Sequence, residues 1–523
     1  MMAKKIVLAL GLVAALPVID QNACLIHAQI TQTAQTAEAA TSSAIARVQS
    51  IDPRVHAVIA LDPTALEQAR SIDKKSGARG ALYGYAILLK DNIEADGPLP
   101  TTAGSMALLE NVTHRDAPLV KRLRGADAVI LGKTNLSEWA NIRSNSSISG
   151  WSGVGGQTRN PFALDRDPCG SSSGSAAAVA AGEVEAAIGT ETDGSITCPA
   201  ALNGVVGLKP TVGLVSRTRI VPISVSQDTA GPITADVTTA ARVLRAIAGA
   251  DPEDAATKDA NSHVEDYLAA LKPDALKGAR IGVMRFAMGW SAGTDKVFER
   301  ALAVLKAQGA TLVDIKELKD HEKMGEAEGL AMNTEFKAGI NAYLATTPAA
   351  VKSRTLADLI AFNQAHADRE LALFGQETFI KAQGMKGLDD PDYKKARETS
   401  LRLAGKDGID AMLAKDQLDA LVCPTMPPAW KIDAANGDQI GGGGAGNFAA
   451  IAGYPHLTVP MGAVMGMPVG LSFMGPAWSE ARLLGLGFAY EQAAKAKLTP
   501  RFLPSIEGEG PVAPLLEPLT GRE

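Results

Sequence analysis

Hydrophobic and polar residues along this chain form short blocks with two alternating periodicities. Segments with apolar residues at helical spacing predict helices, and they cover residues 31–50, 119–124, 175–182 and 235–249. Compact apolar runs bounded by turn residues predict buried strands, at residues 55–61, 83–89, 128–132, 186–189, 281–284, 311–315, 421–423 and 457–459. Strands and helices in this order predict an α/β fold, with helices on both faces of one sheet.

Three stretches depart from this alternation. Residues 145–174 are rich in Gly, Ser, Asn and Pro, and we expect a long ordered loop there. Residues 320–415 are charged and helical throughout, which predicts a helical insertion. The glycine run at 441–446 is expected to be a flexible loop. Pro53 is expected to end the first helix, because proline disfavours continuation of a helix.

The N-terminus has the features of a processing signal. Two lysines precede an uncharged apolar run over residues 6–19, and a small residue, Ala28, follows. This order is typical of a secretory signal peptide, so we expect residues 1–28 to be removed and the protein to be periplasmic or secreted. A retained membrane anchor and a lipid attached to Cys24 are the alternatives.

Composition narrows the classes of function. The chain has 523 residues, of which 46% are hydrophobic and 21% charged, as in an ordinary globular protein with a large core. Its 51 Lys and Arg against 57 Asp and Glu give a net charge of −6 without a basic block, so no nucleic-acid partner is expected. No apolar stretch beyond the first twenty residues could span a membrane, and we expect no stable membrane insertion after signal cleavage.

Small residues are concentrated between Cys169 and Pro210. Two Gly/Ser-rich turns lie there, at residues 170–175 and 190–196, and backbone N–H groups in such turns can point into a shared cavity as oxyanion donors. A nucleophilic serine needs a base, and this region has no histidine. Lys90 ends an apolar run, and it can serve if burial lowers its pKa. On spacing alone, a solvated surface lysine is the alternative.

Two other functions fit parts of the sequence. Residues 170–174 match the GxSxG pattern of an α/β-hydrolase-type esterase, with Ser172 as nucleophile and His456 as base, but no buried strand precedes the turn as that fold requires. An exported α/β chain could also be a non-catalytic solute-binding protein whose Gly/Ser turns hold a ligand. Such a binder has no reason to combine Lys90 with the serines of these turns.

Seven motifs, in order over residues 40–490, resemble those of the amidase signature family of serine hydrolases. They are GYAILLKDN (84–92), DPCGSSSGSAAAVAAG (167–182), GTETDGSITCP (189–199), GVVGLKPT (204–211), SQDTAGP (226–232), IAGYPHLTVPMG (451–462) and GMPVGLSFMG (466–475). The GTETDGS and CGSSSGS variants are most similar to those of bacterial peptide amidases. Members that serve as amidotransferase components tend to carry a second glycine where Asp193 stands.

The resemblance implies a single amidase-signature domain over residues 29–523, with a large mixed, twisted sheet and no cofactor or metal. Within it we expect an N-terminal helical part at 29–80, a signature core at 81–320, the helical insertion at 320–415 and a C-terminal part of the same sheet at 416–500.

The resemblance also implies hydrolysis of carboxylic amides to acid and ammonia through an acyl-enzyme. Ser195 would attack the carbonyl, and Ser171, which follows a cis peptide bond in this family, would relay the proton between Ser195 and a neutral Lys90. The other binding candidates are Thr192, Asp193 and Gly194, whose backbone N–H groups would bind the oxyanion, and Asn145, in the loop that faces the substrate carbonyl in relatives. The expected substrate is a small-molecule or peptide amide, with C-terminal peptide amides as one candidate.

Two cysteines flank the catalytic candidates. Cys169 stands where the family's turn usually has glycine, two residues before Ser171, and Cys198 lies three residues after Ser195. We expect them to be small, buried packing residues rather than a disulfide, and no histidine or aspartate clusters with them to form a metal site. The acyl pocket is expected to come from residues 320–450, which carry the fewest recognisable motifs.

Overall fold

The computed structural model describes residues 35–317 and 321–508, together with residues 512 and 516. The predicted signal peptide at residues 1–28, including Cys24, lies outside the described residues. Within these ranges, no helix is both long and apolar enough to cross a membrane.

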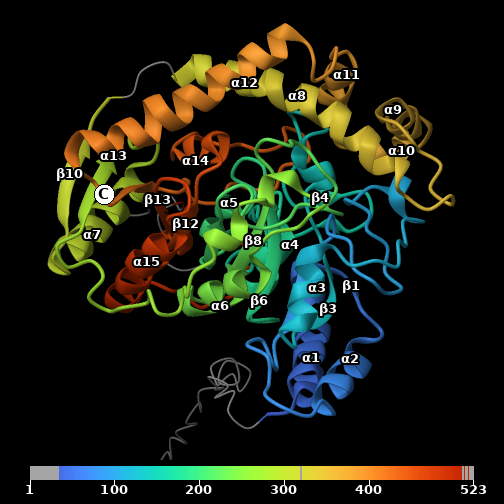
Figure 1. Cartoon of the computed structure of the whole chain (residues 1–523), viewed down its shortest axis with the longest axis horizontal. Coiled ribbons are helices and arrows are strands. Elements are labelled where there is room, and N and C mark those ends of the chain that lie inside the picture. Colours follow the sequence, from blue (N-terminus) through green and yellow to red (C-terminus); the bar gives the residue numbers. More distant parts are fainter. Residues whose placement is uncertain (1–34, 318–320, 509–511, 513–515, 517–523) are drawn as a thin grey trace, which may run out of the picture. The chain divides into compact units, whose positions relative to one another are not determined.

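The framework of the fold is one mixed sheet, with eleven strands in the described part of the chain (Figure 1). In order across the sheet they are β1 (Val58–Leu61), β3 (Val129–Thr134), β2 (Ala86–Lys90), β6 (Ala186–Glu191), β8 (Thr229–Thr234), β7 (Val206–Lys209), β12 (His456–Val464), β13 (Met467–Met474), β11 (Ala420–Pro424), β9 (Arg280–Met284) and β10 (Thr311–Ile315). Strand β2 is parallel to both neighbours, every pair from β6 to β11 is antiparallel, and β9 is parallel to β10 and β11. The predicted mixed sheet is confirmed.

Helices cover both faces of the sheet, as predicted. Ile87 and Leu89 of β2 pack into one hydrophobic cluster, whereas Leu88 between them packs into another, because successive strand residues point to opposite faces. The first cluster includes residues of α3 (Pro118–Gly125), α6 (Val237–Ile247), α7 (Ala292–Ala307) and α15 (Glu480–Ala494). The second includes residues of α1 (Ala37–Val55), α2 (Ala65–Asp73), α4 (Ser173–Ala180) and α5 (Thr197–Leu202).

The segment expected as a helical insertion contains no strand in its described residues. Its helices are α8 (His321–Ala345), α9 (Leu356–Ala365), α10 (Ala367–Glu370), α11 (Glu377–Gln383), α12 (Pro391–Ala404), the π-helical η6 (Gly405–Asp410) and α13 (Ala411–Asp416). Helices α8 and α12 lie side by side (Figure 1). The chain then returns to the sheet through β11 and reaches α14 (Gly446–Ala452), which begins at the last glycine of the run at 441–446.

Short elements complete the connections. The loop at 145–174 includes a two-stranded ribbon of β4 (Trp151–Ser152) and β5 (Gly156–Gln157). The 3₁₀ turns are η1 (Met106–Leu108), η2 (Glu138–Asn141), η3 (Ala255–Thr257), η4 (Ala260–Ser262) and η5 (Arg285–Ala287).

The expected end of the first helix is wrong by two residues. Pro53 lies inside the last turn of α1, which continues to Val55. The helix ends because His56 adopts a left-handed conformation with φ 55°, and because the Asp52 carboxylate accepts the N–H group of Ala57 at 2.6 Å. This capping, rather than the proline, terminates the helix.

Candidate active site

Lys90 is the last residue of β2, and its side chain is completely buried. Its Nζ lies 2.8 Å from the hydroxyl of Ser171, 2.9 Å from the hydroxyl of Thr190 and 3.2 Å from the Thr190 carbonyl. A neutral amine has two N–H donors, which the two Thr190 oxygens can accept, and one lone pair, which is then left for the Ser171 hydroxyl. The alternative of a solvated surface lysine is wrong.

Burial also sets the protonation of this amine. It lowers the pKa of Lys90 to about 7, although the carboxylates of Glu191 and Asp228 favour the charged form. A buried ammonium loses hydration that these carboxylates do not fully replace. Near neutral pH, Lys90 can therefore accept a proton.

Ser171 lies in the loop that leads into α4, and the peptide bond between Gly170 and Ser171 is cis. The Ser171 carbonyl accepts the N–H group of Ser137 at 3.1 Å. Glycine is required at position 170, since a Cβ there would lie 2.1 Å from the Ser137 hydroxyl. This packing holds the Ser171 hydroxyl against Lys90.

Ser195 lies in the turn between β6 and α5. Gly194 has φ 78°, a left-handed conformation that favours glycine, and the Ser195 carbonyl accepts the N–H group of Ser172 at 3.1 Å. This bond joins the turn to the loop that carries Ser171. Both Ser171 and Ser195 line one small cavity, of about 30 Å³.

The turn before Ser195 presents free backbone donors. In the described part of the chain, the structure records no acceptor for the N–H groups of residues 193–195. The next two, of Ile196 and Thr197, donate to the Glu191 carboxylate at 2.7 and 2.9 Å. Free donors beside a serine hydroxyl suit an oxyanion-binding site.

Thr192 and Asp228 also line the small cavity. The Thr192 hydroxyl donates to Asp228 at 2.6 Å, and the same carboxylate accepts the N–H groups of Ile223 and Ser224 at 2.8 and 2.9 Å. The carboxylate therefore ties the turn of Thr192 to a loop that also lines the cavity. Sequence reasoning did not single out Asp228, although it lies within the SQDTAGP motif.

Asn145 is not brought to this cluster. It is exposed, its backbone N–H group donates to Glu377 at 2.6 Å, and it is absent from the walls of the small cavity. The hydroxyl of Ser144 donates to the same carboxylate at 2.7 Å, which fixes this turn against the start of α11. Asn92, whose amide donates to the Thr190 hydroxyl at 3.0 Å, lines the small cavity instead.

A second cavity, of about 560 Å³, borders the same turn. Asp193 and Gly194 line it, whereas Thr192 and Ser195 line the smaller one. Its remaining walls are Thr197, Cys198, Phe286, Trp290, Thr425, Met426, residues 442–448 and His456. None of these residues comes from helices α8 to α13, so within the 320–450 segment only the part from Thr425 onward contributes.

The expectation that Cys169 and Cys198 are separate thiols is wrong. They form a disulfide with a Cα–Cα distance of 6.0 Å across 29 residues of sequence. Their segments converge because Asn203, just after α5, donates its amide to the Pro168 carbonyl at 2.8 Å. The disulfide thus links the Ser171 loop to the helix that follows Ser195. Cys423 is free and buried.

Ser172 and His456, the pair required by the esterase alternative, are not bonded to each other. The Ser172 hydroxyl is buried and donates to the Thr190 carbonyl at 3.1 Å. The Nε2 atom of His456 lies 2.6 Å from the Ser472 hydroxyl, and burial lowers the pKa of this histidine to about 3. The described residues also contain no group of three or more His, Cys, Asp or Glu side chains that could hold a metal ion.

Comparison with known proteins identifies the family of this chain. A family model for amidases matches residues 39–484, and the chain therefore belongs to the amidase family. A probable amidase of Arabidopsis thaliana is 39% identical over 471 residues, covering 87% of this chain and 86% of the plant protein. A glutamyl-tRNA(Gln) amidotransferase component of Caldanaerobacter subterraneus is 35% identical over 492 residues, covering 91% of this chain and 96% of that protein.

The solved structures that this chain resembles include peptide amidases, which are a more specific group than the amidase family as a whole. The peptide amidase of Stenotrophomonas maltophilia is 52% identical, with a TM-score of 0.85 over 90% of this chain and 96% of that one. A peptide amidase bound to the competitive inhibitor chymostatin is 52% identical, with a TM-score of 0.86 and the same coverage. The predictions of family and enzyme class are confirmed: the protein is an amidase, which hydrolyses the C–N bond of amides.

Proposed function

We propose that this amidase hydrolyses primary carboxamides with Ser195 as nucleophile, Ser171 as proton relay and Lys90 as base. The observation that carries the proposal is the 2.8 Å contact between Lys90 Nζ and Ser171 Oγ, at a completely buried amine. Ser171 in turn shares the small cavity with Ser195. A serine becomes a competent nucleophile when a base of matched pKa can take its proton.

The steps follow from this order of groups. Ser195 Oγ attacks the carbonyl carbon, its proton passes to Ser171 Oγ, and the Ser171 proton passes to Lys90 Nζ. The tetrahedral intermediate collapses as the amide nitrogen takes a proton from Ser171, which regains one from Lys90, and ammonia leaves. Water then attacks the acyl ester and loses its proton along the same relay, and Ser195 departs with a proton returned to it. The net reaction converts an amide and water into an acid and ammonia.

The oxyanion of each tetrahedral intermediate is assigned to the free N–H groups of residues 193–195. They adjoin the Ser195 hydroxyl and have no recorded acceptor among the described residues. Each donor of this kind contributes about 3 kcal/mol to the stability of the transition state.

The leaving group is assigned to the small cavity, because the departing nitrogen must reach the Ser171 hydroxyl. A cavity of about 30 Å³ suits a small leaving group such as ammonia better than a substituted amine. This size supports primary amides as substrates, and the larger cavity of about 560 Å³ is left for the acyl part. That volume is within the range of small-molecule binding sites.

A peptide is the acyl part that we propose. The 52% identity to peptide amidases, one of them bound to chymostatin, supports this choice. The test is to incubate the protein with one N-acetylated dipeptide as its carboxamide, its N-methylamide and its anilide. We expect ammonia from the carboxamide and at least about tenfold slower cleavage of the substituted amides. Faster cleavage of the anilide would contradict the leaving-group assignment, and no turnover of any amide would contradict the function.

We also propose that the protein acts outside the cytoplasm. The Cys169–Cys198 disulfide supports this location, because disulfides persist in oxidising compartments and are rare in the cytosol. The signal-peptide pattern at residues 1–28 points the same way.

A further inference from the structure

Asp193 differs from the other carboxylates around the nucleophile turn. The carboxylates of Glu191 and Asp228 accept backbone N–H groups, and Glu328 accepts the side-chain amide of Gln227 at 2.8 Å. For the Asp193 carboxylate, no hydrogen bond or ion pair is recorded among the described residues. Asp193 is exposed, and it lines the 560 Å³ cavity.

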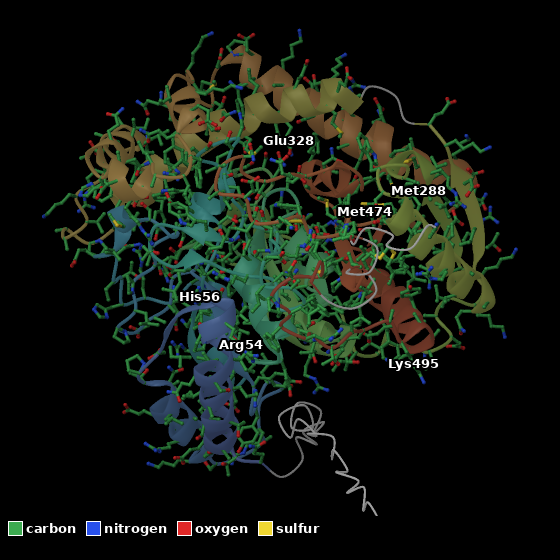
Figure 2. The ribbon with its side chains drawn as sticks, turned by 180° about the vertical axis from the view of Figure 1, so that it is seen from behind. Arg54, His56, Met288, Glu328, Met474 and Lys495 are labelled. Atoms are coloured by element: carbon green, nitrogen blue, oxygen red, sulfur yellow. A yellow bond between two sulfur atoms is a disulfide. The ribbon has the colours of Figure 1, made fainter. Side chains whose placement is uncertain are left out.

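No lysine or arginine is among the described residues that line the larger cavity. Of the described residues that line this cavity, only Asp193 carries a formal charge, since His456 is neutral. The charged groups that act on Asp193 from outside the cavity are the carboxylates of Glu328, on α8 (Figure 2), and of Glu191, and the ammonium of Lys209, which opposes them. Within the cavity, a cation carried by the ligand would be the only positive charge to face Asp193.

The cavity also offers aromatic surface. Trp290 is 62% exposed, and its ring packs over the glycine run, where a Cβ at Gly442 would lie 2.7 Å from it. Phe286 and Phe448 meet edge to face, with ring centroids 6.4 Å apart. An exposed indole binds cations through its π face, so the aromatic surface and the carboxylate favour the same kind of ligand.

A second polar atom lacks a partner at the same cavity. His456 is 1% exposed, and its Nδ1 atom has no hydrogen-bond partner among the described residues. This edge of the ring faces Gly446, another wall residue, where a Cβ would lie 3.2 Å from Nδ1. A neutral imidazole with a free nitrogen can bind an uncharged amide group of a ligand.

We propose that this cavity binds the side chain of the residue that carries the scissile carboxamide, and that Asp193 selects a cationic side chain. The inference rests on the proposed function, because it assumes reaction at Ser195. Asp193 is two residues from Ser195 and lines this cavity, so a substrate side chain that occupies the cavity comes within reach of Asp193. The preferred substrates are peptide amides that end in a guanidinium- or ammonium-bearing residue.

The first test compares two substrates that differ only in charge. N-acetylated dipeptide amides ending in arginine or in citrulline have side chains of nearly equal size, but only arginine is cationic. We expect kcat/KM to be about tenfold higher for the arginine amide in the unmodified enzyme. A ratio near one, or a preference for citrulline, overturns the proposal.

A substrate can also carry a positive charge on a free α-amino group instead of on its side chain. Leucine amide and N-acetyl-leucine amide separate this source from a side chain. We expect acetylation to leave kcat/KM equal or to raise it. If leucine amide is about tenfold better than its acetylated form while arginine and citrulline are equal, the cavity binds an α-ammonium group and the side-chain assignment is wrong.

Two variants test whether Asp193 causes the preference for the arginine amide over the citrulline amide. Asp193→Asn is expected to reduce the arginine-to-citrulline ratio to about two or less, because it removes the charge and keeps the shape. Glu326→Gln removes one charge from the exposed surface of α8, and it should keep the tenfold ratio. If Asp193→Asn slows both substrates equally, Asp193 acts on the turn rather than on the ligand and the proposal fails. No turnover of any amide by the unmodified enzyme refutes the proposed function instead.

Discussion

Replacing Lys90 with arginine tests the base directly. Arginine keeps the positive charge and the hydrogen-bond donors, but its guanidinium does not lose a proton in a protein. The variant therefore cannot accept the Ser171 proton. We expect kcat to fall by a factor of about 10² to 10⁴, the contribution of a positioned general base.

In the unmodified enzyme, kcat/KM is expected to increase with pH as Lys90 loses its proton. Burial lowers the pKa of Lys90 from its ordinary value of 10.5 to about 7, which raises the neutral fraction at pH 7 from ~0.03% to about one half. The active form is the neutral amine, so kcat/KM should rise with pH through 7 and then level off. Below pH 7 it should fall about tenfold per pH unit, because the neutral fraction falls by that factor.

The assay is ammonia release from a peptide amide between pH 5 and 9. The profile alone is not decisive, since burial also lowers the pKa of Lys209, in β7, to about 8. Lys133→Arg is the matched control, because Lys133 is buried in the neighbouring β3 and its Nζ donates to the Ile93 carbonyl rather than to a serine. That variant should lose stability but keep the profile. A Lys90→Arg enzyme with more than about a tenth of the original kcat would refute the reasoning.

Four further results are expected. Ser195→Ala should abolish turnover and leave the melting temperature nearly unchanged, since Gly194 sets the turn; ammonia release by the folded variant would redirect attention to Ser172. Replacing both Cys169 and Cys198 with alanine should lower the free energy of unfolding by about 3–4 kcal/mol in urea titrations, because 29 residues are no longer closed into a loop; an unchanged midpoint would contradict this. His456→Ala should cost about 1–3 kcal/mol of stability, because the buried hydrogen bond to the Ser472 hydroxyl is lost while the one between Ser472 and Thr425 remains, yet Ser195 should still react with a fluorophosphonate; a folded but unreactive variant would favour the esterase alternative. N-terminal sequencing should find the mature chain starting near Gln29 in the exported fraction, and an intact start in the cytoplasm would rule out export.

Much of the fold could be predicted where local pattern and burial agree. The run at residues 311–315 forms β10, and the small-residue segment at 175–182 forms most of α4. Strand β8 was missed, because it contains Gly231 and Pro232, which usually mark a strand boundary. Pro232 nevertheless pairs with Ile188, since β8 lies between β6 and β7 and its neighbours stabilise the extended backbone.

The candidate site was predictable to the extent that each of its residues lies within a short contiguous motif. Ser171, Ser195 and Lys90 each stand inside a recognisable motif, and the structure brings Lys90 to Ser171 and places both serines on one cavity. The disulfide and the contact between Thr192 and Asp228 join residues 29 and 36 positions apart. Such contacts depend on how distant loops pack against each other, and the local pattern of hydrophobic and polar residues does not predict them.

The central claim is that Ser195 becomes acylated because Lys90 removes its proton through Ser171. Incubation with a fluorophosphonate, followed by proteolysis and mass spectrometry, measures this most directly. We predict a single adduct on the peptide that contains Ser195, formed at least about a hundredfold more slowly in the Lys90→Arg variant. An adduct on Ser172, or labelling of Ser195 at an unchanged rate in Lys90→Arg, would contradict the account.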